Sequence, residues 1–160
     1  PMKILGIDPG TAITGFGTIV TSKSQLVIGS CGVIRTPAKQ NQSKRLAHIF
    51  RELEKIIKKT KPDVVVVEKL FFLSNAKTAM TVGEARGVVL LAIEKAGLPL
   101  FEYTPLQVKQ ALTGYGKAEK SQIQMMVKQI LKLKEIPQPD DMADALAIAI
   151  THAFRGKVAK

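Results

Sequence analysis

The sequence predicts a single α/β domain built on a mixed β-sheet. Three extended segments come first, at residues 2–8, 14–21 and 25–36, and the linkers between them are short enough for antiparallel neighbours. After an amphipathic helix, the run of four valines at 64–67 is typical of a strand buried on both faces. A strand that follows a helix in this way is expected to lie parallel to the first strand.

The helices are predicted from apolar residues at helical spacing. Ser43 is expected to cap a helix that ends near Thr60, whose outer face is basic. A second helix is expected between Asn75 and Gly97. The remaining predicted elements are a strand at 98–103 and helices at 105–113, 118–133 and 140–154. The prediction is therefore a five-stranded sheet, with three antiparallel strands followed by two parallel ones, flanked by helices.

Length and composition place the chain among globular proteins. Its 160 residues are 46% hydrophobic and 23% charged, which suits one domain with a real core. We expect residues 2–155 to form this domain, residues 156–160 to be a loose tail, and Pro1 to be left over from processing. No run approaches the roughly 18 apolar residues of a membrane span, and no secretion signal is visible. Together with the single Cys31 this favours the reducing cytoplasm.

The charge balance indicates a polyanionic partner. Lysine and arginine number 24 against 13 aspartates and glutamates, a formal net charge of +11. A basic helix at a membrane surface is the alternative, but it would concentrate the charge on one element. Here the charge is spread from Lys39 to Lys160, which favours nucleic acid.

Two acidic residues stand at the ends of predicted strands. Asp8 follows a buried run and leads into a turn at Pro9 and Gly10, and Glu68 ends the valine run. An acid in such a place is costly unless a cation or donor meets it, and strand ends of open α/β sheets bind ligands. If the two strands are parallel, Asp8 and Glu68 emerge at the same edge of the sheet.

A second group of acids opens the last predicted helix. At about 100° per residue, Asp141 and Asp144 lie roughly 60° apart and share a face. Asp140 and Asp141 have an alternative explanation, because acids complement a helix N-terminus. Asp144 lies a turn further in, before a long uncharged run, and favours a functional role.

Acids from two strand ends and one helix predict a metal site. Unpaired carboxylates repel one another unless a divalent cation neutralises them, and oxygen-only ligands favour Mg²⁺ or Mn²⁺ over zinc. On a basic protein this suggests phosphodiester hydrolysis, in which two ions about 4 Å apart activate a water and stabilise the leaving oxygen. His48 and His152 are interpreted as structural.

Five motifs in order carry a resemblance to a known family. ILGIDPG, VVVVEKLF, VGEARGV, QVKQALTGYGKAEKSQIQ and DDMADALAIAITH resemble the RuvC family, the bacterial Holliday junction resolvases of the ribonuclease H-like fold. The resemblance covers residues 2–153. It implies that Asp8, Glu68, Asp141 and Asp144 are catalytic and hold two Mg²⁺ or Mn²⁺ ions. It also implies an endodeoxyribonuclease that nicks two strands of a junction symmetrically in DNA recombination and repair.

An aromatic pair after Glu68 is a candidate for contact with bases. Phe71 and Phe72 follow in a predicted loop, and two consecutive residues of an extended segment cannot both point inward. A hydrophobic plug is one interpretation, and an aromatic that stacks on or wedges between bases is the other. The resemblance places Phe71 in the second role, and Lys69 beside it is expected to strengthen phosphate contact.

Basic residues further along are candidates for phosphate contact. Lys109, Lys117 and Lys120 are the main ones, Arg86 is a weaker one, and the loop at 114–116 offers backbone N–H groups. Each alone is as well explained as a solvated surface charge. The resemblance favours Lys109 and Lys120 as contacts near the active site.

The resemblance also implies partners. Gly83 and Gly87 lie four residues apart on the second helix and permit close approach of another backbone, either within the chain or from a second copy. The family reading favours a homodimer interface there. It further implies four-way junction DNA as substrate and the RuvAB branch-migration complex as partner.

Three other functions remain as alternatives from the sequence. One is a ribonuclease H-like nuclease that cuts RNA or simple duplexes. Another is an actin-like ATP-binding module that uses the DPGT turn, although the chain is short for a two-lobed cleft. The last is a DNA-binding protein without activity. GYGKAEKS lacks the spacing of a Walker A loop.

Overall fold

A five-stranded mixed sheet forms the centre of the structure, a computed structural model that describes residues 1–69 and 75–156. The strands are β1 (Lys3–Asp8), β2 (Ile13–Thr21), β3 (Leu26–Arg35), β4 (Val64–Glu68) and β5 (Leu100–Tyr103). Their order is β3-β2-β1-β4-β5. β1, β2 and β3 pair antiparallel, and β4 and β5 extend the sheet in parallel from β1. This confirms the predicted sheet.

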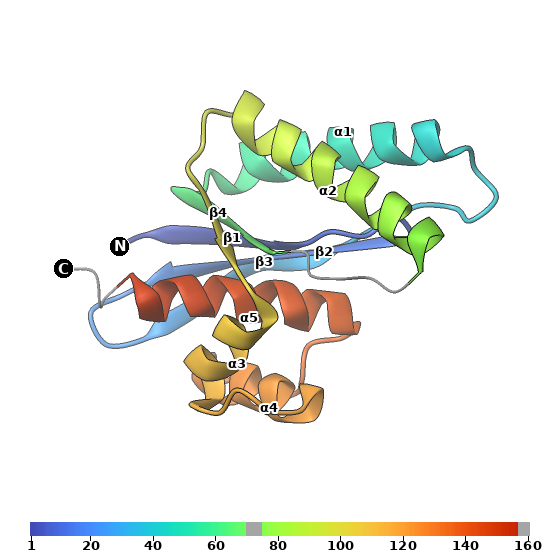
Figure 1. The fold of residues 1–160 in the computed structure, drawn as a ribbon. Coiled ribbons are helices and arrows are strands. Elements are labelled where there is room, and N and C mark those ends of the chain that lie inside the picture. Colours follow the sequence, from blue (N-terminus) through green and yellow to red (C-terminus); the bar gives the residue numbers. More distant parts are fainter. Residues whose placement is uncertain (70–74, 157–160) are drawn as a thin grey trace.

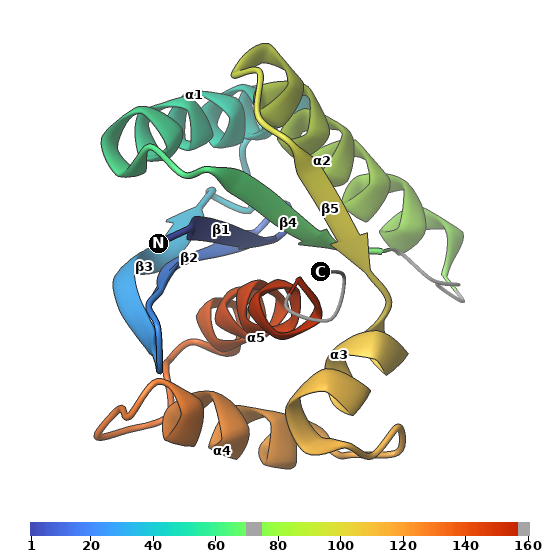
Figure 2. The ribbon, with the colours of Figure 1, turned by 90° about the vertical axis from the view of Figure 1, so that its left-hand side faces the viewer.

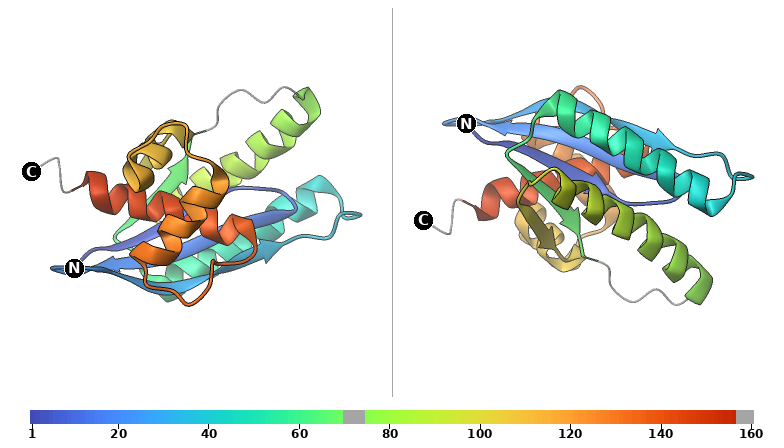
Figure 3. Two further views of the ribbon diagram at one scale, coloured as in Figure 1. Left: turned by 90° about the horizontal axis from the view of Figure 1, so that it is seen from below. Right: turned by 90° about the horizontal axis from the view of Figure 1, so that it is seen from above.

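Helices cover both faces of the sheet. They are α1 (Gln42–Thr60), α2 (Ala76–Lys95), α3 (Pro105–Thr113), α4 (Lys120–Ile130) and α5 (Asp140–Arg155). α1 and α2 lie side by side on one face, while α5 lies on the other, with α3 and α4 outside it (Figures 1, 2 and 3). Within residues 1–69 and 75–156, none of the helices has the length and apolar character needed to cross a membrane.

The predicted helix boundaries hold with two exceptions. Asn75 caps α2 as expected, since its side chain accepts the N–H groups of Lys77 and Thr78. Ser43 is not the cap of α1, which begins one residue before it with Asn41 as the N-cap. The carbonyl of Asn41 already accepts the first helical hydrogen bond, so Ser43 has helical backbone. α4 is shorter than the predicted 118–133.

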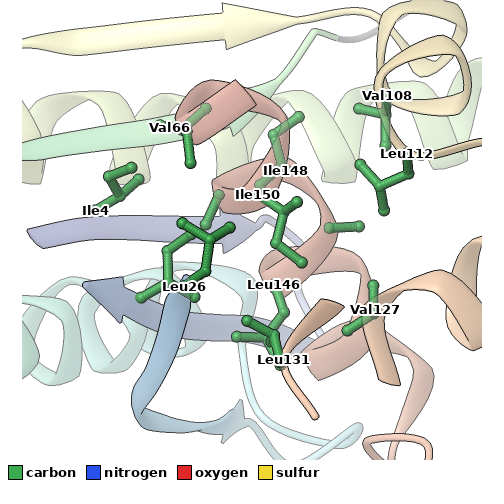
Figure 4. Close-up of a cluster of buried hydrophobic side chains, with 14 of the residues drawn as sticks. Ile4, Leu26, Val66, Val108, Leu112, Val127, Leu131, Leu146, Ile148 and Ile150 are labelled. Carbon is green, nitrogen blue, oxygen red and sulfur yellow. The ribbon is translucent and has the colours of Figure 1, made fainter. Parts of the chain in front are cut away.

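The valine run of β4 divides between two cores, as its position in the middle of the sheet requires. Val64 and Val66 face α5, whereas Val65 and Val67 face α1 and α2, and all four are buried. The α5-side core is completed by apolar residues of α3 and α4 such as Val108 (Figure 4). Alternation along β1 follows the same rule and leaves Ile4, Gly6 and Asp8 on the α5 side.

Two glycines let α5 lie directly on the sheet. A Cβ on Gly6 of β1 would stand 2.0 Å from the carbonyl oxygen of Ala145, and one on Gly15 of β2 would stand 2.0 Å from that of Asp141. The helix is also buried from Ala145 to Ala153, which explains the long uncharged run in its sequence. The contact places the first turn of α5 beside the end of β1, as Figure 1 shows.

Replacing Gly6 by alanine is predicted to destabilise the protein. The new methyl group meets backbone, which cannot rotate away, so α5 must shift off the sheet at a cost of about 1–3 kcal/mol. Thermal unfolding measures the effect as a melting temperature lowered by several degrees. Ser43→Ala, at an exposed helical position without a capping bond, is the control and is expected to unfold as the wild type does.

Candidate active site

Asp8 and Glu68 lie at the same edge of the sheet, as predicted. They are the last residues of β1 and β4, and the parallel register pairs Ile7 with Val67 immediately before them. Alternation directs both carboxylates to the α5 side of the sheet. Two acids on adjacent strands therefore reach the same space beneath the start of α5.

The first turn of α5 brings Asp141 and Asp144 to this space. Gly15 pairs with Asp8 across β1 and β2, and the backbone of Asp141 lies against Gly15. Asp144, Asp141 and Glu68 are close enough to Asp8 for their charges to act on its carboxylate. The structure thus brings together the four carboxylates singled out from the sequence.

Crowding and burial oppose ionisation of this cluster. Burial first, then the charges of Asp144, Asp141 and Glu68, raise the pKa of Asp8 to about 8, while Lys120 acts in the opposite direction. Burial and the charge of Asp144 likewise raise the pKa of Glu68. Burial raises the pKa of Asp144, which Lys120 opposes. A positive charge among these oxygens would relieve the cost.

The side chains of the cluster suit a hard divalent cation. All four offer only carboxylate oxygens, the donors that Mg²⁺ and Mn²⁺ prefer. In the described part of the chain, no three acidic, histidine or cysteine side chains already stand in a metal-binding arrangement. The Nζ of Lys120 lies 3.5 Å from Asp144 and 3.3 Å from Asp140, so a cation already stands at one end of the cluster. The fit to a metal rests on the donor types and on the raised pKa values of Asp8, Glu68 and Asp144.

The turn after Asp8 is held by threonine hydroxyls. Thr14 donates to the carbonyl of Gly10 at 2.6 Å and accepts the Gly10 N–H at 3.3 Å. Thr11 donates to the carbonyl of Thr81 in α2 at 3.1 Å. These bonds tie the turn both to β2 and to α2, and they fix the direction in which β1 presents Asp8.

The predicted basic contacts surround the cluster. Lys109 of α3 and Lys120 of α4 line one pocket with Glu68 and Asp144. Lys69, exposed directly after β4, borders a smaller pocket. Lys117 is exposed in the connection between α3 and α4, and Phe71 and Phe72 lie outside the described residues.

Arg86 is placed differently from the other basic candidates. Its side chain is 12% exposed, and the guanidinium bonds both the carbonyl oxygen of Glu68 and the carboxylate of Glu102. Sequence reasoning missed Glu102, although an acid inside the apolar strand at 98–103 was the available signal. Arg86 also lines a pocket with Asp8, Glu68 and Lys69, and its charge acts to lower the pKa of Glu68, so the pair reaches the cluster from the α2 side of the sheet.

The remaining polar candidates have structural partners. Asp140 lies outside the cluster and accepts a hydrogen bond of 3.2 Å from Gln124 in addition to its ion pair with Lys120. His152 is buried, with its Nδ1 2.8 Å from the hydroxyl of Tyr103 and its ring against Phe101. This agrees with the structural role expected for His152.

The outer face of α2 is open and carries exposed apolar side chains beside the exposed Glu84. Met80 and Leu91 are 69% and 54% exposed, and Gly83 and Gly87 lie between them. A Cβ on either glycine would meet nothing within 4 Å, which removes packing within the described chain as their explanation. Phe101 of the edge strand β5 is also exposed.

Comparison with known proteins gives consistent matches along the whole chain. The family described as crossover junction endodeoxyribonuclease RuvC matches residues 4–152. The protein of that name from Brevibacillus brevis is 57% identical over 152 residues, 95% of this chain and 92% of the relative. That from Pelotomaculum thermopropionicum is 53% identical over 95% of this chain and 93% of its own length. The structure of T. thermophilus RuvC in complex with a Holliday junction substrate aligns with a TM-score of 0.95 at 38% identity, over 99% of this chain and 97% of that one.

The raised pKa of Asp8 predicts a loss of stability as the pH rises. Between the ordinary value of 3.8 and the folded value of about 8, the folded chain binds more protons than the unfolded chain. The free energy of unfolding therefore decreases with increasing pH across this interval. Asp8→Asn cannot ionise and escapes the loss. We expect its melting temperature in EDTA to exceed that of the wild type by a margin that grows from near pH 4 to near pH 8.

A constant difference between the two melting curves over this pH range would contradict the assignment. Asp63→Asn is the matched control, because Asp63 lies before β4 at the other end of the strand and accepts the N–H of Lys3 at 2.7 Å.

Proposed function

The chain belongs to the RuvC family of crossover junction endodeoxyribonucleases, and we propose that it resolves Holliday junctions by hydrolysing one phosphodiester bond in each of two strands. It is a metal-dependent nuclease with a ribonuclease H-like fold. The observation that carries the proposal is the convergence of Asp8, Glu68, Asp141 and Asp144 at the carboxyl edge of β1 and β4. The reaction serves DNA recombination and repair, in the cytoplasm where bacterial DNA lies.

The proposed cofactors are two Mg²⁺ or Mn²⁺ ions held by these four carboxylates. Bound ions would activate the attacking water and stabilise the leaving oxygen of an in-line displacement. Asp8 receives the field of the other three acids and would be one of the residues that hold the ions. The cluster itself supplies no side-chain nucleophile, and the expected products carry 5′-phosphate and 3′-hydroxyl ends.

The proposed DNA contacts lie around the cluster. Lys109 and Lys120 line the pocket beside Glu68 and Asp144 and are expected to meet the phosphate next to the scissile bond. Lys69 and Lys117 are exposed and extend the basic surface. We assign base stacking to the aromatic pair of residues 71 and 72 on the family resemblance, and the net charge of +11 supports binding of DNA overall.

A homodimer is part of the proposal, because two symmetric nicks require two active sites. The exposed stripe of Met80, Gly83, Gly87 and Leu91 on α2 is the proposed interface. The glycines allow two helices to approach closely, and burying the apolar side chains stabilises the contact. The RuvAB branch-migration complex is the further partner implied by the family.

Asp8→Asn is predicted to abolish nicking while it preserves binding. The amide keeps the size of the carboxylate but removes one negative charge that the ions require. A labelled four-way junction incubated with Mg²⁺ should show two symmetric nicks for the wild type, none above about 1% of that rate for the variant, and equal binding without divalent ion. Asp63→Asn, distant from the cluster, is expected to nick normally.

Simple duplexes and RNA–DNA hybrids complete this experiment. Cleavage of these substrates as fast as the junction would favour a general ribonuclease H-like nuclease instead. If the wild type binds the junction but shows no metal-dependent nicking, the result would favour a DNA-binding protein without nuclease activity.

Leu91→Glu is predicted to separate the dimer. A carboxylate introduced on the apolar stripe of α2 must be desolvated opposite its own copy, which opposes association. Analytical ultracentrifugation should show a dimer for the wild type and a shift to monomer for the variant. Met125→Glu places the same charge at an exposed apolar residue of α4 and is expected to remain dimeric. Dimerisation of both variants would place the interface elsewhere.

A further inference from the structure

We propose that Arg86 is a positioning residue that holds the catalytic Glu68 in place from the opposite face of the sheet. This inference rests on the proposed nuclease function and adds a residue to its site. Arg86 lies in the middle of α2, and its guanidinium reaches the ends of β4 and β5 at once. The metal-facing carboxylate and the anchored backbone belong to the same residue.

The anchor acts on the main chain of Glu68. Nη1 of Arg86 donates to the carbonyl oxygen of Glu68 at 2.5 Å. On the next residue, the N–H of Lys69 donates to the carbonyl of Tyr103 at 2.8 Å. The peptide bond between Glu68 and Lys69 is therefore held at both its carbonyl and its N–H. This sets the direction in which the Glu68 side chain leaves the strand toward α5.

Glu102 orients the guanidinium. The register pairs Val67 with Glu102, whose side chain points to the same side of the sheet as α2. It accepts from Nη2 of Arg86, while Nη1 is directed to Glu68. A planar fork that bonds two acceptors at once has a defined orientation, which the single ammonium of lysine does not provide.

Direct contact of Arg86 with a DNA phosphate is disfavoured by the same geometry. The side chain is 12% exposed and that of Glu102 is 27% exposed. To reach a phosphate, the guanidinium would have to abandon a partly buried carboxylate and leave it unpaired, which is costly. The role that agrees with these contacts is support of Glu68.

Supporting groups of this kind have measurable effects on metal sites. Loss of an outer partner that orients a ligand typically lowers metal affinity or activity by about 10–100-fold. Such a loss differs from unfolding, because the overall structure and DNA binding persist.

The decisive variant is the double substitution Arg86→Met with Glu102→Met. It removes both charges together, and replacing a buried ion pair by apolar side chains is often neutral for stability. We expect a melting temperature within a few degrees of the wild type and unchanged junction binding without divalent ion. The single-turnover nicking rate at saturating enzyme and the Mn²⁺ affinity measured by calorimetry without DNA should each fall by about 10-fold or more. Arg86→Lys keeps a charge and a donor, so its nicking rate and Mn²⁺ affinity should lie between those of the wild type and those of the double variant.

Two further arms make the outcome unambiguous. The exposed pair Glu52 and Lys55 on α1, replaced together by methionine, is the matched control and should behave as wild type. If the double variant of Arg86 and Glu102 keeps both Mn²⁺ affinity and nicking rate within about twofold, the positioning role is wrong. If melting temperature and junction binding fall together with the rate, the pair is merely structural and the inference also fails. Absence of nicking by the wild type would instead overturn the proposed function. The Mn²⁺ affinities of the wild type and the double variant would still test whether Arg86 positions Glu68.

Discussion

The central constraint on this molecule is the mutual repulsion of four carboxylates in a partly buried space. Burial and the neighbouring acids raise the pKa of Asp8 to about 8, so the cluster is unfavourable for the folded chain by itself. The rest of the fold supplies the free energy that holds it. α5 is buried along nine consecutive residues from Ala145 to Ala153 and cannot move away from the sheet without exposing its core. The cluster lowers the stability of the folded chain, and the same negative charge attracts a cation.

Rigid contacts set the geometry of the cluster more than its own polar bonds do. Gly6 and Gly15 let the backbone of α5 touch β1 and β2, and the parallel register aligns Asp8 with Glu68. Lys120 stands at the rim and joins Asp140 to Asp144, so the acid outside the cluster keeps a basic side chain next to it. Lys109 lines the same pocket as this lysine, and in the proposed function both would meet a phosphate that approaches the site.

Most of the fold and the four acids were predictable from the sequence, because they depend on local patterns. The valine run, the short linkers and the placement of Asp8 and Glu68 at strand ends determine a sheet edge without any knowledge of packing. Contacts between distant segments were not predictable. The exchange of Ser43 for Asn41 as the cap of α1 depends on where the first helical bond forms, and the pairing of Arg86 with Glu102 depends on α2 crossing β5. Charge alone made Arg86 a weaker candidate for phosphate contact, and the structure adds its partner Glu102.

α2 links features that the sequence presents separately. Its inner side anchors Glu68 through Arg86, its carbonyl at Thr81 accepts from Thr11 in the turn after Asp8, and its outer side exposes Met80 and Leu91. One rigid helix therefore touches the supports of both strand-end acids and the face proposed for the second copy. In a dimer joined through this face, the separation of the two carboxylate clusters is set by the packing of two helices. Such a fixed separation would select substrates in which two scissile phosphates stand at the matching distance, which is how the proposed dimer would distinguish a branched substrate from a simple duplex.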